Sequence, residues 1–263
     1  MCRDSVDMAH GVVTGWVVAS YAAMFSLHAR STCGQQTASP LGPLEALVLD
    51  SIIFDLDGVL VQSEPAHAWA FQQLFAAEGV TFTRDDFKRR ALGVPRRRVI
   101  EGVLGADLPP EKLARLMRDK VRYVEQYIDE QGLEPIPGAL GFVHNARARG
   151  LKLAVATVSR TPMLFLNAIG AADLFDAVLD RTSVERPKPD PSVYLKALAA
   201  LETTAAHALV IEDSPSGVSA AVAAGVRVLA LTTTATAARL HQATAIFPDY
   251  SGIDLDHWIG APP

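Results

Sequence analysis

The stretch SIIFDLDGVL, residues 51–60, joins an apolar run to two closely spaced carboxylates and a glycine. Acidic side chains are depleted in strands, and like charges that are held close together repel each other. Asp55 and Asp57 therefore need a compensating partner, such as a cation, at the end of the strand that the apolar run predicts. Gly58 allows the chain to turn away from this position.

Apolar runs of the same kind recur after residue 48. They lie at residues 52–55, 151–157, 177–179, 208–212 and 226–231. Because most of them lack an alternation of apolar and polar residues, they are typical of strands buried on both faces of a parallel sheet. Helix signals lie between them, for example Thr161 and Pro162 at the start of one segment and Gly170 at its end. The sequence therefore predicts an α/β fold with a doubly wound parallel sheet.

The interval between Asp55 and Thr157 is about 100 residues long, far more than one crossover needs. Amphipathic helices are indicated at residues 65–78, 83–90, 95–104 and 109–130. They predict a separate helical insertion, which can act as a lid over a site at the strand ends. We accordingly expect a core of residues 49–64 and 138–263 and a helical cap of residues 65–137.

Residues 1–48 differ from the rest of the chain. Their apolar stretch, residues 11–27, contains Thr, Ser and Gly and is marginal for a membrane span. We expect a poorly ordered extension, such as one that an upstream start codon would add, with a targeting segment or a structural element as alternatives. The two cysteines, Cys2 and Cys33, both fall here, so a disulfide framework is not expected.

The composition indicates an ordinary soluble globular protein, with 49% apolar and 20% charged residues. The formal net charge is −5, and the basic cluster at residues 96–98 is short and has acidic neighbours. A nucleic-acid partner is therefore not expected. We expect a cytoplasmic monomer or weak dimer without stable membrane association.

The acidic residues at the predicted strand ends suit a magnesium site. Asp55, Thr157, Glu212 and Asp213 all fall at the carboxyl ends of strands, where ligands bind in doubly wound folds. Mg²⁺ usually binds through one or two carboxylates together with substrate phosphate and water. Asp55 and Asp213 can supply the carboxylates, and the backbone carbonyl of Asp57 can supply a third ligand.

The same residues suit phosphoryl transfer. Asp55 can attack phosphorus, because aspartate is a known nucleophile that forms an aspartyl phosphate. Side chains two residues apart in an extended segment face the same way, so Asp57 can protonate the leaving oxygen and later accept a proton from water. Thr157, nearby backbone N–H groups such as that of Val158, and the Lys188 ammonium can bind the phosphoryl oxygens.

Four segments together resemble the haloacid dehalogenase-like (HAD) hydrolase superfamily. They are DLDG at residues 55–58, LKLAVAT at 151–157, KPDP at 188–191 and VIEDSPSGV at 210–218. Their order, spacing and strand context match over roughly residues 49–250. The resemblance implies a Rossmann-like core with a helical cap inserted after the first motif, and Mg²⁺ as cofactor. The implied roles are nucleophile for Asp55, acid/base for Asp57, phosphate binding for Thr157 and Lys188, and metal binding for Asp213 and Glu212.

Within the superfamily, the chain is most similar to the branch of β-phosphoglucomutase and small sugar-phosphate or phosphoglycolate phosphatases. SEPAH at residues 63–67 resembles the segment after the first motif, and LGVPR at residues 92–96 resembles the substrate loop of the cap. The resemblance implies substrate or cap roles for His67, Gly93, Arg96, Ser159 and Arg160.

The leading prediction is a Mg²⁺-dependent phosphatase of a small phosphorylated metabolite. The main alternative is a phosphomutase, which shares Asp55 and Asp57, but mutases typically carry Lys where this chain has Leu92. A dehalogenase would need neither a leaving-group acid nor a metal. A non-catalytic binding protein is the remaining alternative, and the sequence leaves the substrate itself open.

Overall fold

The computed structural model describes residues 48–260 of the chain. Six parallel strands form one sheet in the order β3-β2-β1-β4-β5-β6. They are β1 (Ser51–Phe54), β2 (Lys152–Ala156), β3 (Ala177–Leu179), β4 (Ala208–Glu212), β5 (Arg227–Leu231) and β6 (Ala245–Phe247). Along the chain, β1, β2 and β3 form one half of the sheet. The strands β4, β5 and β6 then form the other half, with β4 beside β1. This topology confirms the predicted doubly wound fold.

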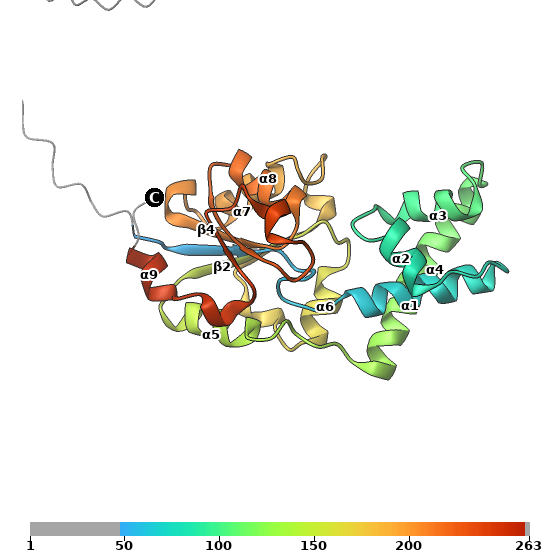
Figure 1. Cartoon of the computed structure of the whole chain (residues 1–263), viewed down its shortest axis with the longest axis horizontal. Coiled ribbons are helices and arrows are strands. Elements are labelled where there is room, and N and C mark those ends of the chain that lie inside the picture. Colours follow the sequence, from blue (N-terminus) through green and yellow to red (C-terminus); the bar gives the residue numbers. More distant parts are fainter. Residues whose placement is uncertain (1–47, 261–263) are drawn as a thin grey trace, which may run out of the picture. The chain divides into compact units, whose positions relative to one another are not determined.

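Helices cover both faces of the sheet (Figure 1). The core helices are α5 (Ala139–Ala148), α6 (Pro162–Ala168), α7 (Ser192–Ala200), α8 (Pro215–Ala223) and α9 (Leu255–Gly260). One hydrophobic cluster joins α5, α6 and α9 to one face of the sheet, and a second joins α7 and α8 to the other face. Because both faces are covered, β1 and β4 are buried at every position, as their unbroken apolar runs predict.

Short 3₁₀ helices connect several of these elements in the described part of the chain. They are Ala172–Leu174, Arg181–Ser183, Ala205–His207, Ala237–Leu240 and Tyr250–Gly252. The sequence prediction did not include β6, whose three residues are only partly buried. A three-residue edge strand is too short to show a hydrophobic pattern.

Four further helices form the inserted cap (Figure 1). They are α1 (Glu64–Ala77), α2 (Arg84–Arg90), α3 (Arg96–Leu104) and α4 (Pro110–Gln131). The cap has a hydrophobic cluster of its own. Phe71 stacks on Phe75 with ring centroids 5.7 Å apart, and Phe82 lies 4.8 Å from Phe75. This cluster holds the cap helices together, while Ala66, Ala70 and Val124 of α1 and α4 also belong to the cluster of the core.

The two segments that connect cap and core are bonded to each other. Val61 and Pro135 form an antiparallel bridge. The backbone N–H of Gln62 donates to the carbonyl of Glu134 at 2.9 Å, and the N–H of Ile136 donates to the carbonyl of Leu60 at 2.9 Å. The connection directly after the first motif is therefore a paired ribbon.

The predicted extension, residues 1–48, lies outside the described residues except for Val48. Its apolar stretch at residues 11–27 is likewise not described. Among residues 48–260, no helix combines the length and the apolar character that crossing a membrane requires.

Gly217, in the first turn of α8, provides a test of how tightly the fourth motif is packed. A Cβ atom at Gly217 would lie 1.6 Å from Oε1 of Glu212, whereas at Gly102 in α3 nothing lies within 4 Å. We expect Gly217→Ala to lower the free energy of unfolding by about 1–3 kcal/mol or more, because the buried carboxylate has to move. Gly102→Ala should raise it by about 0.5–1 kcal/mol. Urea unfolding measures both, and equal effects would contradict the packing described here.

Candidate active site

The structure brings the predicted strand-end residues together between β1 and β4, where the strand order reverses. Asp55 follows β1, Thr157 follows β2, and Glu212 and Asp213 lie at the end of β4. All four residues are buried, with at most 7% of the residue surface exposed. The backbone N–H of Asp55 donates to the carbonyl of Ile211 at 3.0 Å, which extends the β1–β4 pairing to the site. Ligands bind at this reversal point in doubly wound folds.

Lys188 reaches this cluster from the loop that precedes α7. Its Nζ donates to Oδ1 of Asp55 at 2.6 Å, to Oε1 of Glu212 at 2.7 Å and to the carbonyl of Ala156 at 2.9 Å. These bonds use all three donors of the ammonium group. Burial disfavours the charge, but Asp55 and Glu212 outweigh it and raise the pKa of Lys188 well above its usual value. Lys188 is therefore a permanently charged group beside Asp55.

Glu212 uses both of its oxygens within the protein. Oε1 accepts from Lys188 and from the Tyr194 hydroxyl, at 2.7 and 2.8 Å. Oε2 accepts from the backbone N–H groups of Asp213 and Ser214, at 2.8 and 3.0 Å. Burial works to raise the pKa of Glu212, but Lys188 and these donors hold it below its usual value. The metal-binding role predicted for Glu212 stays a prediction, and its geometry favours the positioning of Lys188.

Asp55 and Asp213 are buried carboxylates whose ionised forms are destabilised by burial and by neighbouring acidic groups. Burial raises the pKa of Asp55 to about 7, although the charge of Lys188 lowers it. Burial, together with the charges of Glu212 and Asp55, raises the pKa of Asp213 well above its usual value. Such shifts mark carboxylates whose ionised form a bound cation would stabilise.

Asp213 is held by the loop that follows β5. Its Oδ2 accepts from the Thr234 hydroxyl at 2.6 Å and from the Thr233 hydroxyl at 3.4 Å. The Thr233 hydroxyl also donates to the carbonyl of Gly58 at 2.6 Å. Gly58 has φ +77°, and a Cβ there would lie 2.0 Å from Oδ2 of Asp213. The first motif thus requires glycine because its backbone passes directly against this carboxylate.

The magnesium set that the sequence predicts stays a prediction, for which these residues are the candidates. That set needs two carboxylate side chains, Asp55 and Asp213, and the main-chain carbonyl of Asp57. Among residues 48–260, no group of three or more His, Cys, Asp or Glu side chains is placed to hold a metal ion. The raised pKa values of Asp55 and Asp213 are the observation that favours a cation there.

Asp57 turns its carboxylate toward the cap. Its Oδ1 accepts from the hydroxyl of Ser63 and lies 3.7 Å from Nε2 of His67. Burial works to raise the pKa of Asp57, but the contacts with His67 and Ser63 and the charge of Lys120 hold it below its usual value. In this arrangement Asp57 is ionised, which is the form that can accept a proton. Ser63, which the sequence analysis did not assign to the site, is buried at the start of α1.

Lys120 is the main site residue that the sequence analysis missed. It lies in α4 with 3% of its surface exposed, and its Nζ is 2.6 Å from Nδ1 of His67. Burial and then the charge of Arg96 lower its pKa to about 7. Burial and then the charge of Lys120 lower the pKa of His67. Asp57, His67 and Lys120 thus form a chain of polar contacts that runs from the core into the cap.

A sequence signal for Lys120 exists. Leu116, Lys120 and Val124 are spaced by four residues on α4, and all three are buried. A lysine in the middle of an otherwise apolar helix face is costly unless a specific contact retains it.

The loop after β2 carries the other predicted phosphate and substrate residues. The hydroxyl oxygen of Thr157 accepts from the backbone N–H of Ser159 at 3.0 Å, which leaves its own proton free for a ligand. The Val158 side chain is exposed at 46%, so a phosphate-binding role for this residue rests on its backbone. Arg160, two residues after Val158, lines a cavity with Thr161.

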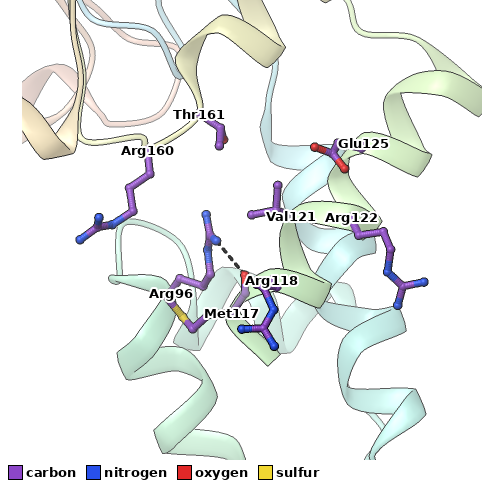
Figure 2. A pocket seen from close by; sticks show the side chains of 8 residues that line it. All are labelled: Arg96, Met117, Arg118, Val121, Arg122, Glu125, Arg160 and Thr161. Atoms are coloured by element: carbon purple, nitrogen blue, oxygen red, sulfur yellow. Dashed lines mark hydrogen bonds between the residues drawn. The ribbon is translucent and has the colours of Figure 1, made fainter. Parts of the chain in front are cut away.

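This cavity, about 460 Å³ in volume, lies between the loop after β2 and cap helices α3 and α4. Figure 2 shows Arg96 and Arg160 on different elements at its wall, with Arg118 and Arg122 from α4 nearby. Arg96 donates to the carbonyl of Met117 at 3.0 Å. Burial and then the charge of Arg160 lower the pKa of Arg96. Two guanidinium groups that repel each other across a cavity favour an anionic ligand there.

Gly93 lies in the cap loop between α2 and α3, away from these contacts. It has φ +71°, and nothing lies within 4 Å of the position that a Cβ would take. The glycine is therefore required by the conformation of the loop, and its predicted substrate role stays a prediction.

Comparison with known proteins agrees with this geometry. Residues 52–231 match the sequence profile of a family described as haloacid dehalogenase-like hydrolases. The protein CbbY of Rhodobacter capsulatus is 36% identical over 195 residues, which cover 69% of this chain and 84% of that protein. A phosphorylated carbohydrates phosphatase of Thermotoga maritima is 32% identical over 181 residues, which cover 68% of this chain and 82% of that protein.

A solved structure shares the architecture. The crystal structure of a CbbY mutant from Rhodobacter sphaeroides, in complex with xylulose-(1,5)bisphosphate, matches with a TM-score of 0.69 at 26% identity. The match covers 78% of this chain and 96% of that one. The described core and cap are therefore those of a known fold.

The buried lysine of the cap yields a prediction about stability. The folded pKa of Lys120 is about 7, below the unfolded value of about 10.4, so the folded state binds fewer protons between these pH values. The stability of the wild-type protein should therefore rise with pH across this window. We expect Lys120→Met to raise the free energy of unfolding by about 1–3 kcal/mol at pH 7 and by less at pH 9.5.

Urea unfolding at both pH values measures this effect. Lys88→Met, which changes an exposed lysine of α2, serves as control and should shift stability by less than about 0.5 kcal/mol. A Lys120→Met variant that is less stable than wild type at pH 7 would contradict the prediction.

Proposed function

The chain belongs to the haloacid dehalogenase-like hydrolase family, and we propose on this basis that it is a Mg²⁺-dependent phosphatase of small phosphorylated sugars or similar metabolites. The observation that carries the proposal is the contact of 2.6 Å between Lys188 and Asp55, beside a second buried carboxylate at Asp213. The names of the two similar proteins, CbbY and the phosphorylated carbohydrates phosphatase, support a phosphorylated carbohydrate as substrate.

Asp55, Asp213 and the main-chain carbonyl of Asp57 would hold the metal ion. Bound there, Mg²⁺ would neutralise charge on the phosphoryl oxygens and keep both carboxylates ionised. Lys188 and the Thr157 hydroxyl would bind other phosphoryl oxygens, because the ammonium contacts Asp55 and the Thr157 hydroxyl keeps its own proton for a ligand.

Asp55 acts as the nucleophile in this proposal. One of its carboxylate oxygens forms a bond to phosphorus, the bond between phosphorus and the ester oxygen breaks, and Asp57 gives a proton to the leaving oxygen. Asp57 then takes a proton from water, which attacks the aspartyl phosphate and releases inorganic phosphate. The first step needs protonated Asp57, whereas Ser63 and His67 stabilise its ionised form. Asp57 therefore has to leave these partners before it can act as the acid.

The cap cavity is the candidate binding site for the rest of the substrate. The guanidinium groups of Arg96 and Arg160 suit a second anionic group of the substrate, beyond the phosphoryl group that reacts. The xylulose-(1,5)bisphosphate in the similar CbbY structure carries two phosphates. A sugar bisphosphate is accordingly a substrate class to test. The cytoplasmic location expected from the sequence stays a prediction.

The catalytic proposal is tested by phosphate release from a panel of sugar, glycolate and nucleotide phosphates with Mg²⁺. We expect hydrolysis of at least one sugar phosphate or bisphosphate, and a loss of kcat of at least about 1,000-fold in Asp55→Asn, because the amide cannot attack phosphorus. EDTA should abolish turnover and excess Mg²⁺ should restore it. Conversion of β-glucose 1-phosphate to glucose 6-phosphate without phosphate release would instead establish the mutase alternative, and release from no substrate would contradict both.

The role of the cavity is tested by Arg96→Ala against a matched control on the same helix. Arg98 is exposed, so Arg98→Ala removes the same charge at a site away from the cavity. We expect Arg96→Ala to raise the KM for a sugar bisphosphate by about tenfold or more, because it removes a charged hydrogen-bond donor. The KM for p-nitrophenyl phosphate should change little. Equal effects of the two variants would show that the cavity binds no second anionic group.

A further inference from the structure

Tyr194 lies beneath the candidate active site and has no role in the scheme above. It belongs to α7, six residues after Lys188, and its surface is fully buried. Its hydroxyl donates to Oε1 of Glu212 at 2.8 Å, and Nζ of Lys188 lies 4.8 Å from the centre of its ring. One side chain therefore contacts both the ammonium group and the carboxylate that holds it.

The bonds of Lys188 create a conflict with phosphate binding. Its three donors are used by Asp55, Glu212 and the carbonyl of Ala156. To donate to a phosphoryl oxygen, the ammonium has to release one of these partners. Glu212 is the strongest competitor, because it is a fully buried charge and attraction between charges is large in a medium of low dielectric constant.

Glu212 and a phosphoryl group compete for the Lys188 ammonium, and the Tyr194 hydroxyl affects this competition through one atom of Glu212. It donates to the same oxygen, Oε1 of Glu212, that accepts from Lys188. A second donor on this oxygen neutralises part of its charge and so weakens its hold on the ammonium. The ring beneath Nζ provides a cation–π contact that keeps the ammonium near Asp55.

We propose that Tyr194 is a positioning residue that keeps Lys188 available for the phosphoryl group by sharing Oε1 of Glu212 with it. The proposal rests on the proposed phosphatase function. Without the hydroxyl, Oε1 would have Lys188 as its side-chain donor, and the ammonium would move toward Glu212 and away from Asp55. Phosphate binding would weaken although every side chain of the predicted motifs is still present.

The test is Tyr194→Phe, which keeps the ring and its packing and removes the hydroxyl. Inorganic phosphate, with Mg²⁺ present, serves as the probe in calorimetry, and KM and kcat are measured with the best substrate of the panel. We expect the Kd for phosphate and the KM to rise about tenfold, the order of effect of one hydrogen bond to a charged group. Tyr127→Phe removes a hydroxyl from a partly buried tyrosine of the cap and should leave both constants within twofold of wild type.

A purely structural role gives a different result. Partial unfolding of Tyr194→Phe would lower the melting temperature and kcat but leave KM unchanged, because the molecules that remain folded bind normally. That result would overturn the proposal, and so would constants equal to those of wild type. A wild-type protein that neither binds phosphate nor hydrolyses any ester would overturn the proposed function as well, so the two failures are distinguishable.

A second variant tests the role of Oε1 of Glu212. In the Glu212→Gln background the side chain at position 212 is neutral, so its amide oxygen competes for the ammonium only weakly. Tyr194→Phe should then change the Kd for phosphate by less than about twofold, which is the coupling expected of residues that act through one another. A full tenfold effect in that background would show that the hydroxyl acts independently of Glu212.

Discussion

The ammonium group of Lys188 is the constraint on which the site depends. Its three bonds reach Asp55 after β1, Ala156 in β2 and Glu212 in β4, so one side chain joins the carboxyl ends of three adjacent strands. A buried ion pair is weak evidence for stability, but the loss of one partner leaves an uncompensated charge, at a cost of about 3–5 kcal/mol. The arrangement therefore fixes geometry more than it adds stability.

The carboxylates of Asp213 and Glu212 constrain the backbone around the ion pairs of Lys188. Gly58 and Gly217 each lie where a Cβ would collide with an acidic oxygen, of Asp213 and of Glu212 respectively. The loop of the first motif and the first turn of α8 can thus approach the acidic side chains closely. Thr233 reinforces this approach, because its hydroxyl bonds both to Gly58 and to Asp213. Because the main chain packs closely against these buried charges, it holds the acidic groups in position without additional residues.

The cap contains a polar contact of opposite character. Lys120 is buried and His67 is partly buried, and both lose basicity in these positions, whereas Lys188 in the core gains it. The difference follows from the partners: Lys188 faces two carboxylates, while Lys120 faces an imidazole and the charge of Arg96. Lys120 in the cap loses its proton easily, whereas Lys188 in the core keeps its charge. This combination suits the proposed site, in which Asp57 alternates between acid and base. The proposed phosphatase and the mutase alternative would share this core, so we expect the cap to decide between them.

The sequence by itself determined the sheet, the inserted helices and the polar residues that end the strands, because these depend on local patterns. Unbroken apolar runs predict buried parallel strands, and each is followed by the polar residue that marks its carboxyl end, as at Asp55 and Thr157. The tertiary structure alone decided which atoms meet. It placed Lys120 beside His67, 53 positions earlier in the chain, turned Asp57 toward Ser63, and used both oxygens of Glu212 for protein donors. It also decided the edge strand β6, which is too short to have a pattern of its own. The physical reason is that composition and periodicity report burial, whereas hydrogen-bond partners depend on how distant segments pack.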